Sequence, residues 1–423
     1  MGGRLEEDFA QPSPPAQLPG LFTREFMQDP YPTYSWLRSI QPVAHVVLPR
    51  GVPVKLVTSH EAAREALADP RLSKNPRFLS PSIPRQAVGL PDEFRLGLGH
   101  HMVNADPPDH RRLRRVAGAA FTPRRTELLR SRVEAISAQL LDPLVDQGHA
   151  DFMAAFAHPL PTLVLCELLG VPLNLQAEFR EITDPHLAGH RARGRVGRSG
   201  RRMRRFVREL IDATRRAPGE NLLADLVLAT DDGELNESEL ISTVFLLLIA
   251  GHGTSINLLG NGLHALLTHS EQLQHLRGTP ALLGPAIEEL LRFDSPVDIT
   301  TWRFAAESFE LAGSLIRAGD PVLVSLGAAN RDPAAFHEPN RLELSRAGSK
   351  HVAFGFGIHY CLGAPLARLQ GEIVFAAVLD RLPDLRLDAD AGTLRWRSGL
   401  LRRGLEHLPI AFRHPGSGQC PVR

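Results

Sequence analysis

FGFGIHYCLG, residues 354–363, brings a single cysteine, Cys361, to the start of a predicted helix. Gly355 and Gly357 permit backbone turns in which a Cβ would clash, and Gly363 allows the following helix to approach a flat ligand. Backbone amides at the loop and the helix start are expected to donate to the thiolate and lower the pKa of Cys361. This combination of glycines, amides and cysteine is typical of a thiolate that binds a metal.

The other two cysteines carry weaker signals. Cys166 ends the apolar run LVLC, residues 163–166, and is expected to be a small buried hydrophobic side chain. Cys420 lies in a polar C-terminal segment. Three cysteines that are odd in number and far apart do not form a disulfide framework, which favours a reducing compartment.

Composition limits the class of protein. The chain has 423 residues, 43% of them hydrophobic, and is therefore long enough to bury a large core. A formal net charge of +1 gives no reason to expect nucleic acid as a partner. The N-terminus lacks a basic segment followed by an apolar one, and the most apolar run, residues 244–250, is too short to cross a bilayer. The sequence predicts a cytoplasmic protein without a membrane partner.

Hydrophobic periodicity predicts a mainly α-helical protein with small peripheral β-sheets. Residues 1–20 and 414–423 lack apolar periodicity and are predicted to be mobile tails around a single domain, residues 21–413. Helical patterns cover residues 124–145, 154–169, 200–216, 237–269, 283–293 and 364–382. Short strands are predicted at residues 43–48, 55–58, 309–311 and 322–325.

The cysteine stretch resembles the haem-binding loop of the cytochrome P450 family, because the pattern F-G-x-G-x-H-x-C-x-G is complete. The resemblance implies haem b (iron protoporphyrin IX) with Cys361 as the axial ligand of its iron. It also implies cofactor contacts from Phe354, Gly355, His359 and Gly363. The expected fold is that of a cytochrome P450, with a long central helix over the haem.

The central helix opens with a capping box, Asn236 and Glu239, and is expected to run for about 30 residues, or roughly 45 Å. Residues 241–250 are apolar on nearly every face, so this helix should be buried. AGHGTS, residues 250–255, follows, and its small residues would leave room beside a flat cofactor. Close packing of two helices would explain the same small residues.

This segment resembles the family's oxygen-activating motif A-G-x-[DE]-T-[TS], which makes Ala250, Gly251, His252, Gly253 and Thr254 the catalytic candidates. Thr254 matches the motif threonine, but the acid position is Gly253, so the motif holds no carboxylate to relay protons. His252 could shuttle protons near neutral pH or could instead face the core. Ordered water or substrate hydroxyl groups are the remaining proton donors.

Glu289 and Arg292 lie three residues apart on one face of an apolar helix. They match the family's E-x-x-R pair, and the P-x-R segment of the family is PNR, residues 339–341. The resemblance implies a buried structural triad of Glu289, Arg292 and Arg341 behind the cysteine loop. Removal of one partner would leave an unpaired buried charge.

The two propionates of haem require cations and hydrogen-bond donors. His110 and Arg114 lie four residues apart on one predicted helical face and match the family segment that reaches the propionates. Arg303 and His359 match two further family positions. The resemblance implies that these four side chains hold the propionates.

The substrate pocket is inferred from the topology of the family and resembles that of bacterial members that tailor secondary metabolites. The resemblance assigns it Met102, Val103, Leu247, Val297, Ile299, Thr300, Leu400 and Leu401. Residues 191–216 are rich in arginine, which indicates either solvated helix faces or recognition of an anionic substrate or an acidic carrier protein.

The resemblance implies electron supply from a ferredoxin and a ferredoxin reductase, and a monomer is expected. Arg111, Arg112, Arg115 and Arg368 are the candidate docking residues. The leading hypothesis is a monooxygenase that hydroxylates or epoxidises a small, mainly apolar natural product. Because Gly253 replaces the acid, an enzyme that uses peroxide, desaturates, couples or rearranges is the alternative. A non-catalytic haem protein or helper subunit is the third hypothesis.

Overall fold

The computed structural model describes residues 20–48, 51–84, 97–119, 121–183 and 196–413. The two predicted tails lie outside the described residues, apart from residue 20.

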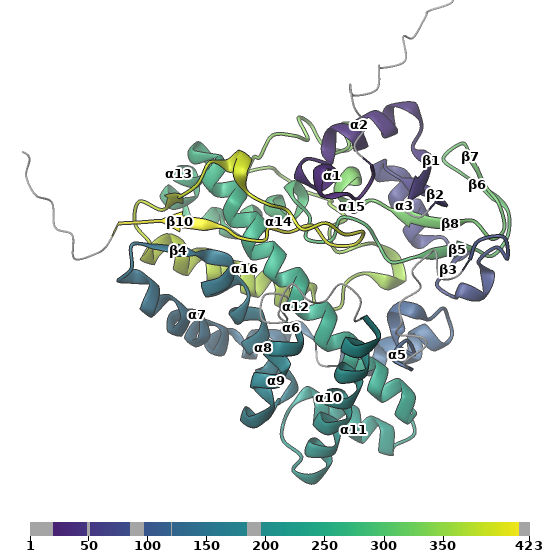
Figure 1. Ribbon diagram of the computed structural model, residues 1–423, viewed down its shortest axis with the longest axis horizontal. Helices are drawn as coiled ribbons and strands as arrows, with labels where there is room; N and C mark the ends of the chain where they lie inside the picture. The colour runs from purple at the N-terminus through teal and green to yellow at the C-terminus, as the bar shows by residue number, and fades with distance from the viewer. Residues whose placement is uncertain (1–19, 49–50, 85–96, 120, 184–195, 414–423) are drawn as a thin grey trace, which may run out of the picture.

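Helix α12, Glu237–Thr268, is the central element, and its capping box between Asn236 and Glu239 is present. Figure 1 shows it passing through the middle of the molecule, between the helices at the bottom and the sheet at the upper right. Of the described helices it alone is long and apolar enough to span a membrane by length and composition. Since 72% of its most apolar window is buried inside the protein, it has the character of a core helix.

Two predicted helices are divided in the structure. Residues 124–145 form α6, Pro123–Leu128, and α7, Arg130–Val145, with the hydroxyl of Thr122 capping α6. Residues 154–169 form a π-helical turn, Met153–Ala157, and α8, Pro159–Leu169. Proline has no backbone N–H to donate to the preceding turn, so α8 begins afresh at Pro159.

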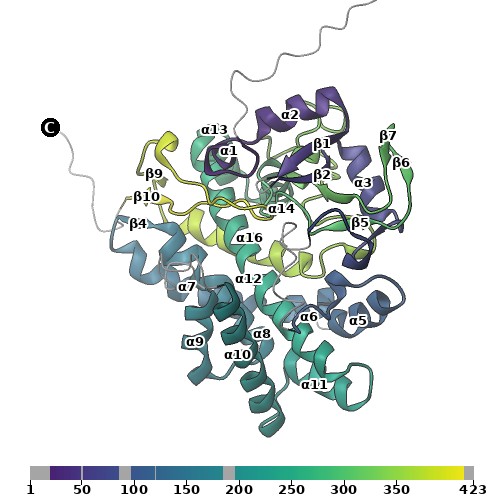
Figure 2. The same cartoon turned by 45° about the vertical axis from the view of Figure 1, so that its right-hand side comes forward.

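The remaining helices surround α12, and Figure 2 shows α9, α10 and α11 together at the lower end. The helices before α12 are α1 (Arg24–Gln28), α2 (Tyr31–Ile40), α3 (His60–Ala68), α5 (Asp109–Gly118), α9 (Leu173–Thr183), α10 (Val196–Arg216) and α11 (Leu222–Asp231). Those after it are α13 (Ser270–Gly278), α14 (Leu283–Phe293), α15 (Leu326–Ala329) and α16 (Ala364–Arg381). The predictions for residues 283–293 and 364–382 are therefore confirmed to within one residue.

The largest sheet has five strands in the order β1-β2-β8-β5-β3. Its strands are β1 (Val43–Leu48), β2 (Val52–Val57), β3 (Leu72–Ser73), β5 (Arg303–Ala305) and β8 (Pro321–Val324). A second sheet joins β4 (His149–Asp151), β10 (Pro409–Ala411) and β9 (Arg386–Leu387), and β6 (Phe309–Leu311) pairs with β7 (Ser314–Ile316). The mainly α-helical class with small sheets is confirmed.

The pairing of β3 with β5 brings two basic residues close together. Ser73 lies opposite Phe304 in antiparallel register, so the residues that flank this pair, Lys74 and Arg303, are brought close together. Two segments that are separated by more than 200 residues of sequence thus contribute basic side chains to one place.

Candidate active site

The loop before α16 holds Cys361 in a fixed turn. Gly355 and Gly357 have φ angles of 75° and 73°, in the left-handed region that favours glycine. A Cβ on Gly357 would lie 2.9 Å from the carbonyl oxygen of Leu67, so this position has no room for a side chain. The Cys361 amide donates to the carbonyl oxygen of Phe354 at 2.8 Å and closes the loop.

The thiol of Cys361 faces a cavity and retains accessible surface. Burial raises its pKa, while hydrogen bonds from the backbone amides of Gly363 and Ala364 and the positive charge of Arg114 oppose the rise. The expected lowering of this pKa was wrong, because desolvation outweighs the amides. Cys166 is buried as predicted, and desolvation raises the pKa of its thiol to about 12.

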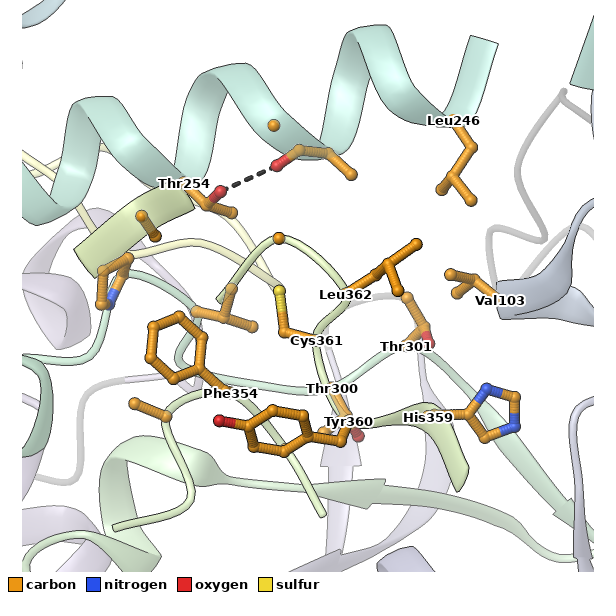
Figure 3. A pocket seen from close by; sticks show the side chains of 18 of the residues that line it. Val103, Leu246, Thr254, Thr300, Thr301, Phe354, His359, Tyr360, Cys361 and Leu362 are labelled. Atoms are coloured by element: carbon orange, nitrogen blue, oxygen red, sulfur yellow. Dashed lines mark hydrogen bonds between the residues drawn. The ribbon is translucent and has the colours of Figure 1, made fainter. Parts of the chain in front are cut away.

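The cavity has a volume of about 320 Å³ and lies between the cysteine loop, α12 and residues 296–301. Figure 3 shows Cys361 and Thr254 facing one another across it, from the loop and from α12. The predicted pocket residues that line it are Met102, Val103, Leu247, Val297 and Thr300. Side chains that the sequence did not single out also line it: Phe121, Leu165, Leu246, Ser255, Leu258 and Pro296.

Three predicted pocket residues do not line the cavity. Ile299 is fully buried in the main hydrophobic core, because it faces the opposite side of its extended segment from Thr300. Leu400 packs against the same core. Leu401 lies at the surface with 38% of its area exposed, and its carbonyl oxygen accepts from the amides of Asp298 and Ile299.

The motif on α12 is split between two faces of the helix. Ala250, Gly251 and Thr254 line the cavity, and the hydroxyl of Thr254 donates to the carbonyl oxygen of Ala250 at 2.8 Å (Figure 3). His252 is buried and does not line the cavity. Gly253 does not line it either and packs against the guanidinium of Arg402. The alternative in which His252 faces the core is therefore the one that the structure supports.

A group of basic side chains lies at one edge of the cavity, and we name it the cation cluster. Its members line the cavity together: Lys74, His110, Arg114, Arg303 and His359. The rings of His110 and His359 are in contact, with their centroids 4.4 Å apart. Arg114 donates to the carbonyl oxygen of Tyr360 at 2.8 Å. The four predicted propionate-binding residues thus lie together.

Lys74 is the member that sequence reasoning missed. Its ammonium group donates to the hydroxyl of Thr301 at 2.6 Å and to the carbonyl oxygen of Trp302 at 2.9 Å. No local motif marks this lysine, since only the pairing of β3 with β5 brings it to the cavity.

The basic groups of the cation cluster outnumber the carboxylates that act on them, which are those of Asp106 and, for Arg303, Asp69. Desolvation lowers the pKa of Arg303 to about 10, and desolvation together with the charges of Lys74 and Arg303 lowers that of His359 to about 2. Both ring nitrogens of His110 and Nε of Arg303 are buried without a hydrogen-bond partner among the described residues. Buried donors without partners beside unbalanced cations fit the two carboxylates of haem.

A second buried group behind the cysteine loop is named the ion-pair cluster: Glu289, Arg292 and Arg346. Arg292 is fully buried and donates to both carboxylate oxygens of Glu289, at 2.7 and 2.8 Å. Nε of Arg346 donates to the same carboxylate at 3.2 Å. Three backbone carbonyl groups accept the remaining donors of Arg292, those of Asn330, Pro339 and Arg341.

The prediction that Arg341 is the third member of this triad was wrong. Its side chain is 64% exposed and pairs with Glu338 at the surface, whereas the side chain of Arg346 is only 9% exposed. The backbone turns after Arg341 so that its carbonyl oxygen, and not its guanidinium, faces Arg292. The ion-pair cluster is linked to the cysteine loop because Asn330 accepts from the amide of Val352 at 2.7 Å.

Comparisons with known proteins agree with this site. Residues 281–383 match the family model described as Cytochrome P450. The chain is 42% identical over 406 residues to cytochrome P450 monooxygenase PikC of Streptomyces venezuelae, with 95% of each chain covered. It is 41% identical to 6-deoxyerythronolide B hydroxylase of Saccharopolyspora erythraea, over 93% of this chain and 98% of that one.

The fold agrees as well. The structure of the tirandamycin C-bound P450 monooxygenase TamI superposes with a TM-score of 0.85 at 41% identity, covering 92% of this chain and 99% of that chain. The chain belongs to the cytochrome P450 family. It is a monooxygenase-type oxidoreductase of the secondary-metabolite group, and haem is its cofactor.

Proposed function

We propose that this protein is a haem-thiolate monooxygenase that inserts one oxygen atom from O2 into a small, mainly apolar natural product, by hydroxylation or epoxidation. The observation that carries the proposal is the placement of Cys361 opposite Thr254 across an apolar cavity whose edge is the cation cluster. Cys361 would hold the haem iron through its thiolate, and residues 21–413 would act as one catalytic domain.

Haem supplies the oxygen-activating chemistry when it is bound, and the protein supplies the surroundings. Lys74, His110, Arg114, Arg303 and His359 would hold the propionates, as their unbalanced charge and unpartnered nitrogens favour. The lining of the cavity, in which leucine is the most frequent residue, excludes water and fits an apolar substrate. The hydroxyl of Thr254 is positioned at the cavity as a hydrogen-bond donor or acceptor.

The relatives support a natural-product substrate. One is named as the hydroxylase of 6-deoxyerythronolide B, and the TamI structure contains tirandamycin C. We further propose that the protein is a cytoplasmic monomer that receives electrons from a ferredoxin and its reductase.

The ion pairs of the four arginines proposed to bind ferredoxin show which of them is free to form the docking surface. Arg112 pairs with Glu239 at 2.5 Å, Arg115 with Glu234 at 3.0 Å and Arg368 with Glu288 at 2.7 Å. Each of these charges is already balanced by a neighbouring acid. Arg111 is exposed and forms no ion pair among the described residues, so it is the strongest docking candidate of the four.

Three arginines of α10 are balanced in the same way, whereas Arg201, Arg204, Arg208 and Arg216 form no ion pair among the described residues. Arg202 pairs with Glu178 and Glu181, Arg205 pairs with Glu178, and Arg215 pairs with Glu237. The paired arginines fit a solvated helix face. The arginines without an ion pair would be the ones to recognise an anionic substrate or an acidic carrier protein.

One observation favours a second candidate function. The described residues that line the cavity include no aspartate or glutamate, so none of them offers a carboxylate to relay protons. An enzyme that uses peroxide, or that desaturates, couples or rearranges its substrate, would depend less on such a relay.

The test is the absorption spectrum of the reduced protein with carbon monoxide. Wild type and the control Cys166→Ser are expected to show the strongly red-shifted Soret band of thiolate ligation, and Cys361→Ser is expected to lose it. A wild-type band typical of histidine or neutral thiol ligation would contradict the proposal. Turnover with hydrogen peroxide in place of redox partners then separates the second candidate from the first.

A further inference from the structure

Arg402 fills the place that the acid of the family motif would take on α12. A Cβ built on Gly253 would overlap Nη1 of Arg402 and would lie 3.0 Å from its Cζ. The guanidinium therefore lies directly against the backbone of α12, one residue before Thr254. Any residue other than glycine at position 253 would force this guanidinium to move.

The segment that carries Arg402 borders the cavity. Arg402 forms a β-bridge with Val297, and the amide of Arg403 donates to the carbonyl oxygen of Pro296 at 3.2 Å. Pro296 and Val297 both line the cavity, as do Leu246 and Ala250 on the adjoining part of α12. Arg402 and Gly253 are not themselves among the residues that line the cavity, so the guanidinium lies in the wall, between two elements whose neighbouring residues line it.

The neighbouring arginine, Arg403, lies in a different environment. Arg403 is buried and pairs with Asp294 at 2.9 Å, and it also donates to the carbonyl oxygens of Met27 and Gln28. Arg402 forms no ion pair or side-chain hydrogen bond with any described residue, although much of its surface is accessible. Desolvation lowers the pKa of its guanidinium, and no acidic side chain of the described ranges opposes this.

An accessible guanidinium without a partner in the described chain is free to bind an anion from outside the chain. The propionates of haem are not that anion, because the cation cluster that fits them comes from other elements, β3, α5, β5 and the cysteine loop. A single guanidinium without other described cations beside it matches a monovalent carboxylate, since its two parallel N–H groups fit the two oxygens. A phosphate dianion would require further positive charge.

We propose that Arg402 binds a carboxylate of the substrate, so that the enzyme prefers carboxylic acids over neutral compounds with the same skeleton. The proposal rests on the proposed function and names the substrate class of that site. Gly253 provides the room for the guanidinium, and the bound carboxylate lies beside position 253 of α12.

The experiment compares acids with their primary amides on the haem-loaded full-length chain. The probes are dodecanoic acid and dodecanamide, and 4-phenylbutanoic acid and 4-phenylbutanamide. Binding is followed by the change in the Soret band and by isothermal titration calorimetry. Wild type is expected to bind at least one acid about tenfold or more tightly than its amide, as a charge-assisted hydrogen bond permits.

Arg402→Gln is expected to lose this preference while its affinity for the amides changes less than about twofold. Gly253→Asp, which places a carboxylate against Arg402, is expected to lose the preference as well. Arg395→Gln is the matched control, because Arg395 is exposed on the same C-terminal segment and should bind like wild type. Arg402→Lys keeps the charge without the two parallel donors and should retain part of the preference.

Equal affinity of wild type for acid and amide in both pairs overturns the proposal, and so does an unchanged preference in Arg402→Gln. These outcomes are distinguishable from failure of the proposed function. A chain that shows the red-shifted band but no acid preference keeps the monooxygenase function and loses the carboxylate site. A chain without that band loses the function, whatever its affinity for acids in the calorimeter.

Discussion

The ion-pair cluster and the cation cluster are both buried and rich in arginine, yet they differ in how their charge is balanced. In the ion-pair cluster, Glu289 receives hydrogen bonds from Arg292 and Arg346, and backbone carbonyl groups accept the donors that remain. In the cation cluster, Arg303 and His110 keep unpartnered nitrogens, and desolvation, together with the charges of Lys74 and Arg303, lowers the pKa of His359.

The difference indicates two roles. A cluster whose charges are balanced within the chain stabilises the fold, whether or not a cofactor is bound. A cluster with excess positive charge is stabilised only when an anion binds. It therefore contributes to the affinity for that anion and not to the stability of the fold. Substitutions in the two clusters should therefore affect different measurements.

The largest effect is expected for Glu289→Gln. This change leaves Arg292 and Arg346 buried without their carboxylate, which should lower the free energy of unfolding by about 3–5 kcal/mol. Chemical denaturation of haem-free and haem-loaded protein checks it, and the loss should be similar in both. A loss confined to the haem-loaded protein would remove the distinction between the clusters.

The next effect is expected for Arg303→Gln. The rate of haem loss to excess apomyoglobin should rise roughly tenfold to a hundredfold, since a charge-assisted hydrogen bond contributes about 1.5–3 kcal/mol. The haem-free protein should be no less stable than wild type, because the change removes a buried cation whose desolvation outweighs the attraction of Asp106 and Asp69. Unchanged haem loss would contradict the assignment of Arg303 to the propionates.

An intermediate effect on stability, which depends on pH, is expected for Glu288→Gln. Burial alone would raise its pKa, but hydrogen bonds from Arg368 and His351 outweigh burial and lower the pKa to about 2. Because the folded-state pKa lies below the unfolded one, the carboxylate stabilises the protein above about pH 4.5 and loses this effect as pH falls toward 2.

The stability difference between wild type and Glu288→Gln should therefore be on the order of 1–2 kcal/mol at pH 7, allowing for partial exposure of the pair. It should shrink steadily below pH 4.5. Thermal unfolding between pH 7 and pH 3 measures this difference, and a difference that grows with acidity would have the wrong sign.

The smallest effect is expected for Arg341→Gln. Its guanidinium is largely exposed and pairs only with Glu338, so the free energy of unfolding should change by less than about 0.5 kcal/mol. Arg346→Gln should cost several times more because it contacts Glu289. Equal losses of unfolding free energy in the two variants would indicate that Arg341 belongs to the ion-pair cluster.

Local patterns were sufficient for several parts of the site. The capping box located the start of α12, and its continuous apolar run identified it as a buried helix. Gly355 and Gly357 were correctly read as turn residues, because their φ angles lie where only glycine is free of strain. Helix caps and glycine turns depend on neighbours within a few residues, so the sequence displays them directly.

Contacts between segments that are distant in the sequence could not be predicted from local patterns. The P-x-R pattern indicated Arg341, but the backbone turn after it brings Arg346 to Glu289 instead. The alternation of Ile299 and Thr300 between core and cavity depends on how their segment packs against the residues near Leu401. No sequence motif indicated that Lys74 belongs to the site.

The sequence by itself determined the cysteine loop, the long central helix, the family and the absence of an acid at position 253, since each resides in a continuous run of residues. Only the tertiary structure decided which basic side chains gather at the cavity, which arginine completes the ion-pair cluster, and that Arg402 occupies the space beside Gly253. The physical reason is that charges and side-chain volumes act through space, across segments whose spacing along the chain does not record their contact.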